Sequence, residues 1–283
     1  MKGWWWLLCW LIGPTWGGIV ELKLPTGLVA RAEFRDGAPA KPAILLLHGF
    51  LQTHEFPVIH RLTESLGSAG FTVLAPTLSL GISSRKQSLA CEALNTHTQA
   101  DAINEIDAWV KWLKAQKPRG IVLLGHSFGS MQLLAYASTK PDPAIRKFIG
   151  VSIIEGRMEF PAATHRQLMR ELDEVVRKGD HQIVVQPLSF CRKYRASPAS
   201  LMSYLAWTPE RILKAVNRAA LPVTFIMGGQ DDRLGQDWLE KLGRTRARLH
   251  VIQGANHFMD GEYEFDLMDV VLAELKPLQA PPR

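Results

Sequence analysis

The sequence predicts an α/β fold in which a mostly parallel central sheet is covered by helices on both faces. Short aliphatic runs, such as Ala43–Leu47 and residues 121–124, are typical of strands that are buried on both faces. Amphipathic segments such as Gln99–Ala115 alternate with these runs, which is typical of a parallel sheet. Because such sheets bind ligands beyond the carboxyl ends of their strands, we expect a functional site there.

Length and composition are those of one domain with a large core, with or without an insertion. The chain has 283 residues, of which 47% are hydrophobic. Its 33 basic and 27 acidic residues give a net charge of +6, which is too mild to indicate a nucleic-acid-binding protein. No internal repeat and no stretch of 18 apolar residues is present, so no clear membrane-spanning helix is predicted.

The N-terminal segment differs in composition from the rest of the chain. Lys2 precedes an apolar run over residues 4–12, and small and turn residues follow. This order predicts a signal peptide over residues 1–18 and an exported protein, periplasmic or secreted, whose mature domain spans 19–283. The alternatives are a buried first strand and an uncleaved membrane anchor. We expect membrane contact only through this segment, if it stays uncleaved.

The N-terminal half of the mature domain alternates strand and helix patterns in a regular order. The expected elements are two extended segments around a turn at residues 25–27, a strand at Ala43–Leu47, a helix at 57–69, a strand within 71–79 and a helix at Gln99–Ala115. Thr98 and Asp101 have the spacing of a capping box at the start of that last helix.

The C-terminal half continues the pattern. The expected elements are a strand at residues 120–125, a helix over 131–137, strands within 146–155, 221–229 and 248–254, a helix around 238–242 and a last helix over 267–275. Residues 157–220 interrupt the alternation with an apolar helical stripe (Leu168 to Val176) and a second helix after Ser197 and Pro198. With 11 basic and 6 acidic residues, this segment predicts a small helical lid insertion.

A serine stands between two glycines directly after the strand at 120–125. Gly125, Ser127 and Gly129 fit the pattern G-x-S-x-G, in which a nucleophilic serine is mounted on a tight strand-to-helix turn. The pattern alone is weak, but a buried strand precedes it and a helix follows, as the chemistry requires. Serine also needs a base that is oriented by an acid. Further along the chain, Asp231 and Asp232 follow one strand and His257 follows the next.

Donors for a developing oxyanion are expected at the end of the first buried strand. His48, Gly49 and Phe50 follow that strand, and the backbone N–H groups of Phe50 and Phe128 form the natural pair of donors. We interpret His48 as a hydrogen-bonding scaffold residue. His97 lies beside a helix cap, which explains its neighbourhood without a catalytic role.

Together these motifs resemble the α/β-hydrolase superfamily over nearly the whole mature domain. The matching stretches are LLLHGF, GHSFGS, GGQDDRL and GANHF. The resemblance implies an α/β-hydrolase fold with Ser127 as nucleophile, His257 as base and Asp232 as the acid that orients His257. Asp232 is preferred to Asp231 because related members place the acid three residues after the glycine that ends the strand, taken here as Gly229.

The resulting hypothesis is a serine hydrolase that cleaves a small-molecule carboxylic ester or acyl substrate through an acyl-enzyme. It needs no cofactor, and no metal-ligand spacing is present. The alternatives are an acyltransferase, thioesterase or peptidase with the same triad, and a catalytically silent ligand-binding member. Substrate identity, acyl-chain length and oligomeric state are not predicted.

Two cysteines, Cys91 and Cys191, lie in the mature domain, whereas Cys9 lies in the signal segment. In an exported protein these two would be expected to pair. Such a bridge would join the lid to the body, and the two Cα atoms should then lie within roughly 7 Å of each other.

Overall fold

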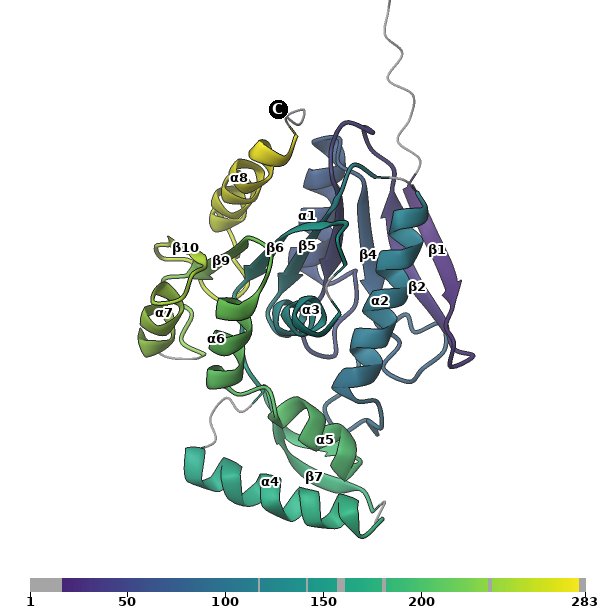
Figure 1. Ribbon diagram of the computed structural model, residues 1–283, viewed down its shortest axis with the longest axis vertical. Helices are drawn as coiled ribbons and strands as arrows, with labels where there is room; N and C mark the ends of the chain where they lie inside the picture. Colours follow the sequence, from purple (N-terminus) through teal and green to yellow (C-terminus); the bar gives the residue numbers. More distant parts are fainter. Residues whose placement is uncertain are drawn as a thin grey trace, which may run out of the picture.

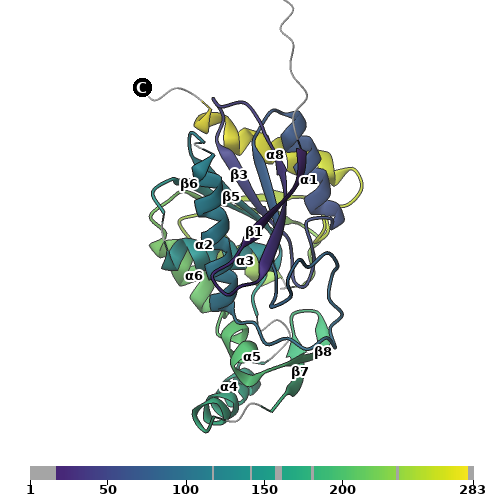
Figure 2. The same cartoon turned by 90° about the vertical axis from the view of Figure 1, so that its right-hand side faces the viewer.

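The computed structural model describes residues 17–116, 118–140, 142–156, 161–179, 182–233 and 236–279. Within them, an eight-stranded sheet separates two layers of helices, which confirms the expected α/β architecture (Figures 1 and 2). Residues 1–16, most of the predicted signal segment, lie outside this description. The first strand begins at Gly17, inside the predicted range 1–18.

The sheet is antiparallel at one edge and parallel elsewhere. Its strand order is β1-β2-β4-β3-β5-β6-β9-β10, and only β2 pairs antiparallel with its neighbours β1 and β4. The parallel strands therefore end at one common edge. The strands are β1 (Gly17–Lys23), β2 (Val29–Arg35), β3 (Ala43–Leu47), β4 (Val73–Thr77), β5 (Ile121–His126), β6 (Ile145–Val151), β9 (Val223–Gly228) and β10 (Arg248–Ile252).

Helices cover both faces because the central strands are apolar on both. Along β3, Ile44 and Leu46 face one helical layer, whereas Leu45 and Leu47 face the other. The first layer holds α1 (Pro57–Ser68) and α8 (Tyr263–Leu275), with the short 3₁₀ turn η1 (Lys276–Leu278) after it. The second layer holds α2 (Gln99–Ala115), α3 (Phe128–Thr139), α6 (Pro209–Arg218) and α7 (Gln236–Gly243).

The segment predicted as a lid, 157–220, forms a lobe from α4 (Ala162–Arg177) to α5 (Pro198–Leu205) that extends below the sheet in Figures 1 and 2, whereas its last helix, α6, belongs to the layer on the sheet. This insertion lobe comprises α4, β7 (Val184–Leu188), β8 (Cys191–Ala196) and α5. Its two predicted helices are confirmed. The antiparallel β7–β8 hairpin was not predicted, because its strands are short, carry a proline and are held by residues far away in sequence. The sequence reasoning also missed α6, which packs on α3.

Covalent and backbone bonds fasten the hairpin to the body. Cys91 and Cys191 form a disulfide with their Cα atoms 5.4 Å apart, which confirms the expected pairing. Beside it, the Asn95 N–H donates to the Arg195 carbonyl at 2.9 Å, and the Ser197 N–H donates to the Asn95 carbonyl at 3.0 Å. The hairpin is therefore held against the loop that precedes α2.

A buried carboxylate ties the last helix to three neighbouring strands. Glu274 of α8 accepts hydrogen bonds from Lys147 of β6, Thr224 of β9 (2.8 Å), and Arg248 (2.8 Å) and His250 (2.9 Å) of β10. Burial opposes ionisation of this carboxyl, but the four donors outweigh it and lower its pKa to about 2. The ionised carboxylate therefore stabilises the folded chain.

Among the described residues, none of the helices combines the length and apolar character needed to cross a membrane.

Glu274→Gln should lower the free energy of unfolding by about 3–5 kcal/mol at neutral pH, because Lys147 loses its buried counter-ion. The pKa is lower in the folded state, so Glu274 stabilises above about pH 4.5 and its contribution disappears as the pH falls toward 2. Urea unfolding across this range should show a flatter pH dependence for the variant. Asp269→Asn, at an exposed position on the same helix, is the control and should match wild type.

The disulfide predicts the reactivity of the three cysteines. In denaturant without reductant, alkylation of the full chain should modify only Cys9, and reduction should release two more thiols, as counted by mass spectrometry. The bridge closes a loop across 100 residues, so replacing Cys91 and Cys191 together by serine should cost at most roughly 4–5 kcal/mol. Three reactive thiols before reduction would contradict the bridge.

Candidate active site

Ser127 lies at the turn between β5 and α3, as the sequence predicts. Its backbone adopts φ 56° and ψ −124°, a strained conformation for a residue with a side chain. A Cβ on Gly125 would lie 2.7 Å from the Ser130 Cα, and a Cβ on Gly129 would lie 2.2 Å from the His48 carbonyl oxygen. The two glycines therefore let α3 begin directly against the ends of the strands.

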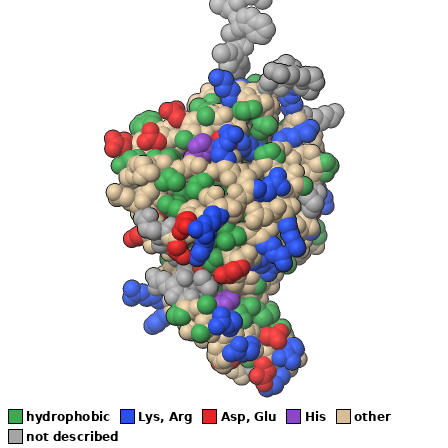
Figure 3. Space-filling view, turned by 60° about the vertical axis from the view of Figure 1, so that its left-hand side comes forward, with side chains coloured by type: hydrophobic (Ala, Val, Ile, Leu, Met, Phe, Trp, Pro, Cys, Tyr) green, Lys and Arg blue, Asp and Glu red, His purple; other side chains and the backbone are tan. Residues whose placement is uncertain are grey.

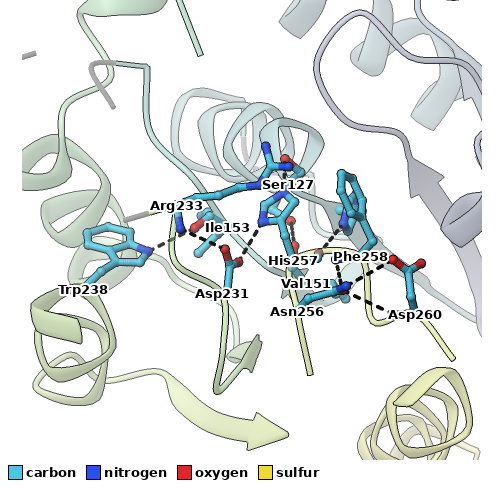
Figure 4. Close-up of polar contacts among 12 residues, drawn as sticks. Ser127, Val151, Ile153, Asp231, Arg233, Trp238, Asn256, His257, Phe258 and Asp260 are labelled. Carbon is cyan, nitrogen blue, oxygen red and sulfur yellow. Dashed lines mark hydrogen bonds and ion pairs between the residues drawn. The ribbon is translucent and has the colours of Figure 1, made fainter. Parts of the chain in front are cut away.

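A continuous hydrogen-bonded chain runs from Ser127 to a carboxylate (Figure 4). The Ser127 Oγ lies 2.8 Å from the His257 Nε2, and the His257 Nδ1 lies 2.7 Å from the Asp231 Oδ2. Because a carboxylate accepts, Nδ1 carries the proton that faces Asp231, which leaves Nε2 to accept from the serine hydroxyl. The side chains of His257 and Asp231 are only 4% and 5% exposed. This is the arrangement needed to remove a proton from serine.

The prediction that Asp232 is the aspartate in contact with His257 is wrong. Asp231 contacts His257, whereas Asp232 is exposed at the outside of the turn. The reason is where the strand ends: β9 stops at Gly228, not at Gly229, and three residues after Gly228 is Asp231. Two successive glycines concealed this boundary in the sequence.

The loops that carry the acid and the base are fastened to each other. After β9, the Gly229 N–H donates to the Ile252 carbonyl at 2.8 Å, and the Gln230 N–H donates to the Ala255 carbonyl at 2.9 Å. The Arg233 N–H also donates to the Asp231 Oδ1 at 3.3 Å. The two bonds between the loops set their separation through backbone groups, and the Arg233 N–H orients the Asp231 side chain.

The loop after β3 lies directly beside Ser127. A Cβ on Gly49 would be 3.3 Å from the Ser127 Cβ, and the Phe50 ring packs on the Phe128 ring with centroids 4.7 Å apart. Phe128 is the first residue of α3, so its N–H is one of those that a helix leaves without an intrahelical partner. Both expected oxyanion residues are thus next to the serine.

His48 holds this loop in place, which agrees with its expected scaffold role. Its Nδ1–H donates to the Gly49 carbonyl at 2.8 Å, and its Nε2 accepts from the Leu78 N–H at 3.1 Å. Burial, followed by the nearby charge of Arg85, lowers the pKa of His48 to about 3. The imidazole therefore stays neutral and keeps both hydrogen bonds at physiological pH.

Two supporting residues were missed by the sequence reasoning. Arg85 is buried and donates to the carbonyls of Leu78 (2.7 Å) and Gln52 (2.6 Å), which joins the loops around the site. The buried His126 ring donates from Nε2 to the His257 carbonyl at 3.0 Å. Burial, then the charge of His257, lowers the pKa of His126 to about 3. The GHS motif pointed to His126, but a single arginine in a polar loop gave no signal.

His97 is not part of the hydrogen-bonded chain of Ser127, His257 and Asp231, although it lines the same small cavity as Phe50 and Phe128. It is buried, its ring is 5.6 Å from that of Tyr204, and burial lowers its pKa to about 4. Thr98 and Asp101 beside it form the expected capping box. Within the described ranges, no group of three His, Cys, Asp or Glu side chains is placed to hold a metal ion.

Comparison with known proteins gives a family match over most of the chain. Residues 44–266 match the model described as "Alpha/beta hydrolase family". No curated protein matches in a search of their sequences.

Solved structures share the fold at low sequence identity. The alpha/beta hydrolase GrgF from Penicillium sp. sh18 has a TM-score of 0.70 and 18% identity, covering 94% of this chain and 99% of its own. Est1E from Butyrivibrio proteoclasticus has a TM-score of 0.63 and 18% identity, covering 92% and 99%. A monoacylglycerol lipase from Paleococcus ferrophilus has a TM-score of 0.63 and 19% identity, covering 89% and 99%.

Gly129→Ala should destabilise the fold by about 1–3 kcal/mol, because its Cβ would overlap the His48 carbonyl and force α3 away from β3. Gly18→Ala is the matched control, since a Cβ there meets no atom within 4 Å. It should stay within about 0.5 kcal/mol of wild type. Urea unfolding measures both, and equal stabilities of the two variants would contradict the close approach.

Proposed function

Because the chain belongs to the alpha/beta hydrolase family, we propose that it is a serine hydrolase that cleaves a carboxylic ester through an acyl-enzyme. The observation that carries this proposal is the hydrogen-bonded chain from the Ser127 Oγ through His257 to Asp231, with distances of 2.8 and 2.7 Å. Three buried groups at these distances have the order and geometry that acyl transfer to serine requires.

In the proposed first step, the Ser127 Oγ attacks the ester carbonyl carbon while His257 Nε2 takes the hydroxyl proton. The resulting imidazolium is stabilised by the Asp231 carboxylate on Nδ1. Collapse of the tetrahedral intermediate breaks the bond to the alcohol, and His257 returns the proton to the leaving oxygen. Water activated by His257 then hydrolyses the acyl-enzyme and releases the acid.

The oxyanion is proposed to accept hydrogen bonds from the backbone N–H groups of Phe50 and Phe128. The proximity of the Gly49–Phe50 loop to Ser127 supports this assignment, and so does the place of Phe128 at the start of α3. A helix N-terminus also carries partial positive charge that favours an anion. Because these donors are backbone groups held by packing, they need little reorganisation as charge develops.

The neutral histidines support the role of His257 as base. His48 and His126 are buried with pKa values lowered to about 3, so neither carries a positive charge at neutral pH. Their hydrogen bonds orient the oxyanion loop and the His257 backbone instead. In this scheme His257 is the imidazole that exchanges the proton with the reacting serine.

Ser127→Ala should abolish hydrolysis of p-nitrophenyl esters, with a loss of about 10³–10⁶-fold in kcat and an unchanged circular dichroism spectrum. Esters of graded chain length, assayed alone and with added thiols or amines, test the reaction type. Near-normal turnover by Ser127→Ala would remove the nucleophile assignment. Transfer of the acyl group to the added thiol or amine at a higher rate than hydrolysis would identify an acyltransferase instead.

Asp231→Asn should lower kcat by about 10⁴-fold, because an amide cannot stabilise the imidazolium and favours the wrong tautomer. Asp232→Asn removes the same charge one residue away from an exposed position and is the matched control. Its activity should stay within about threefold of wild type. The reverse ranking would assign the acid to Asp232.

A further inference from the structure

The exposed apolar side chains gather on and beside the β7–β8 hairpin. Among the described residues, seven large hydrophobic side chains are exposed, and four of them belong to this region. Isolated exposed apolar residues are ordinary, but a cluster on one small element indicates a contact surface. The four are Leu94 (50% exposed), Ile183 (37%), Val185 (53%) and Phe190 (50%).

The same hairpin carries three cations that pair with no carboxylate in the part of the chain that the structure describes. Arg192, Lys193 and Arg195 are exposed, and none of them forms an ion pair with a described residue. Residues 181–209 contain no Asp or Glu. Elsewhere on the lobe, Arg177 and Lys178 of α4 pair with acidic residues of their own helix, and Figure 3 shows basic and acidic side chains intermixed there. The hairpin therefore lies in a stretch that carries basic residues and no acidic one, whereas α4 carries both signs.

Val185, Lys193 and Arg195 share one face of the hairpin, whereas Arg192 alternates onto the other face. Val185 lies directly opposite Arg195 in the ladder, so the two project from the same face, whereas Tyr194 and Ala196 are buried against the body. Phe190 lies at the turn, next to the disulfide-bonded Cys191. The bridge holds this surface in one conformation, so little ordering is needed when it binds.

We propose that the β7–β8 hairpin is a docking surface for anionic lipid bilayers. Unpaired cations attract a negatively charged membrane surface, and exposed aliphatic and aromatic side chains enter the boundary between headgroups and acyl chains. A nucleic acid or an acidic protein would use the charges alone. The apolar turn at Phe190 is the feature that favours lipid.

The position of Phe190 links this surface to the site. Its ring packs on the Phe50 ring with centroids 5.6 Å apart, and Phe50 packs in turn on Phe128. A docked membrane would therefore lie beside the oxyanion loop and would present lipid-borne esters to Ser127. The presentation of lipid-borne esters to Ser127 rests on the proposed hydrolase function, whereas the docking itself does not.

Sedimentation of the full chain with phosphatidylglycerol vesicles tests the docking surface. Arg192→Gln/Lys193→Gln/Arg195→Gln should lower the partition coefficient about 10- to 100-fold at low salt. Lys114→Gln/Lys241→Gln/Arg244→Gln removes three charges from other exposed positions and should change it less than about threefold. Both triple variants retain the N-terminal segment, so any contribution of this segment to vesicle binding is the same in the two. Equal binding by both triple variants would overturn the proposal.

Phe190→Ser separates lipid from other polyanions. It should weaken binding to phosphatidylglycerol vesicles severalfold, and it should leave binding to heparin unchanged. Wild-type binding to heparin as strong as to vesicles, together with no effect of Phe190→Ser on vesicles, would overturn the lipid assignment in favour of an acidic macromolecule. Circular dichroism and thermal unfolding verify that each variant is folded.

Hydrolysis distinguishes failure of the docking from failure of the proposed function. A soluble ester and an ester dissolved in phosphatidylglycerol vesicles are compared for wild type and the hairpin triple variant. The variant should lose rate about 10-fold or more on the vesicle-borne ester alone. Vesicle binding without hydrolysis of either ester would refute the hydrolase proposal and leave the docking intact. Equal loss on both esters would contradict a docking role.

Discussion

The close approach of α3 to the carboxyl ends of β3 and β5 is the constraint on which the site depends. It exists because Gly125 and Gly129 lack a Cβ at positions where one would overlap backbone atoms. The approach forces Ser127 into a positive φ and costs about 1–3 kcal/mol of local strain. Burial of nearly all of α3, from Phe128 to Ala137, compensates because each large apolar side chain contributes about 1.5–3 kcal/mol. Packing energy thus holds a serine in a conformation that it would not adopt alone.

Buried polar side chains also orient the site, and the two histidines among them do so without adding charge to it. His48 and His126 are kept neutral by burial. The hydrogen bond of His48 holds the loop of Phe50, and that of His126 holds the backbone of His257. Arg85 performs a similar task by donating to backbone carbonyls. Hydrogen bonds offset the cost of burying these groups, although the buried Nδ1 of His126 has no hydrogen-bond partner among the described residues. Each bond therefore favours the loop conformation in which it forms.

The insertion lobe reaches the site through aromatic contacts. Phe50 contacts Phe190 and Tyr194 of the lobe and also Phe128, the first residue of α3. The disulfide and the backbone bonds of Asn95 limit how far the hairpin can move from the body. The loop of Phe50 therefore lies between the turn at Ser127 and the lobe, and its packing couples the two.

The sequence by itself determined the layered α/β architecture, the strands of the parallel sheet and the strand-to-helix turn at Ser127, whereas the pairing of Cys91 with Cys191 was expected only for an exported protein and was decided by the tertiary structure. The features that the sequence determined depend on local patterns: continuous apolar runs, helical periodicity and small residues at a turn. It did not determine which aspartate contacts His257, because the end of β9 at Gly228 is set by pairing with β10. The hairpin, α6 and Arg85 were decided only by the tertiary structure, since their partners lie far away along the chain. Long-range contacts, unlike local periodicity, leave no mark in a single sequence.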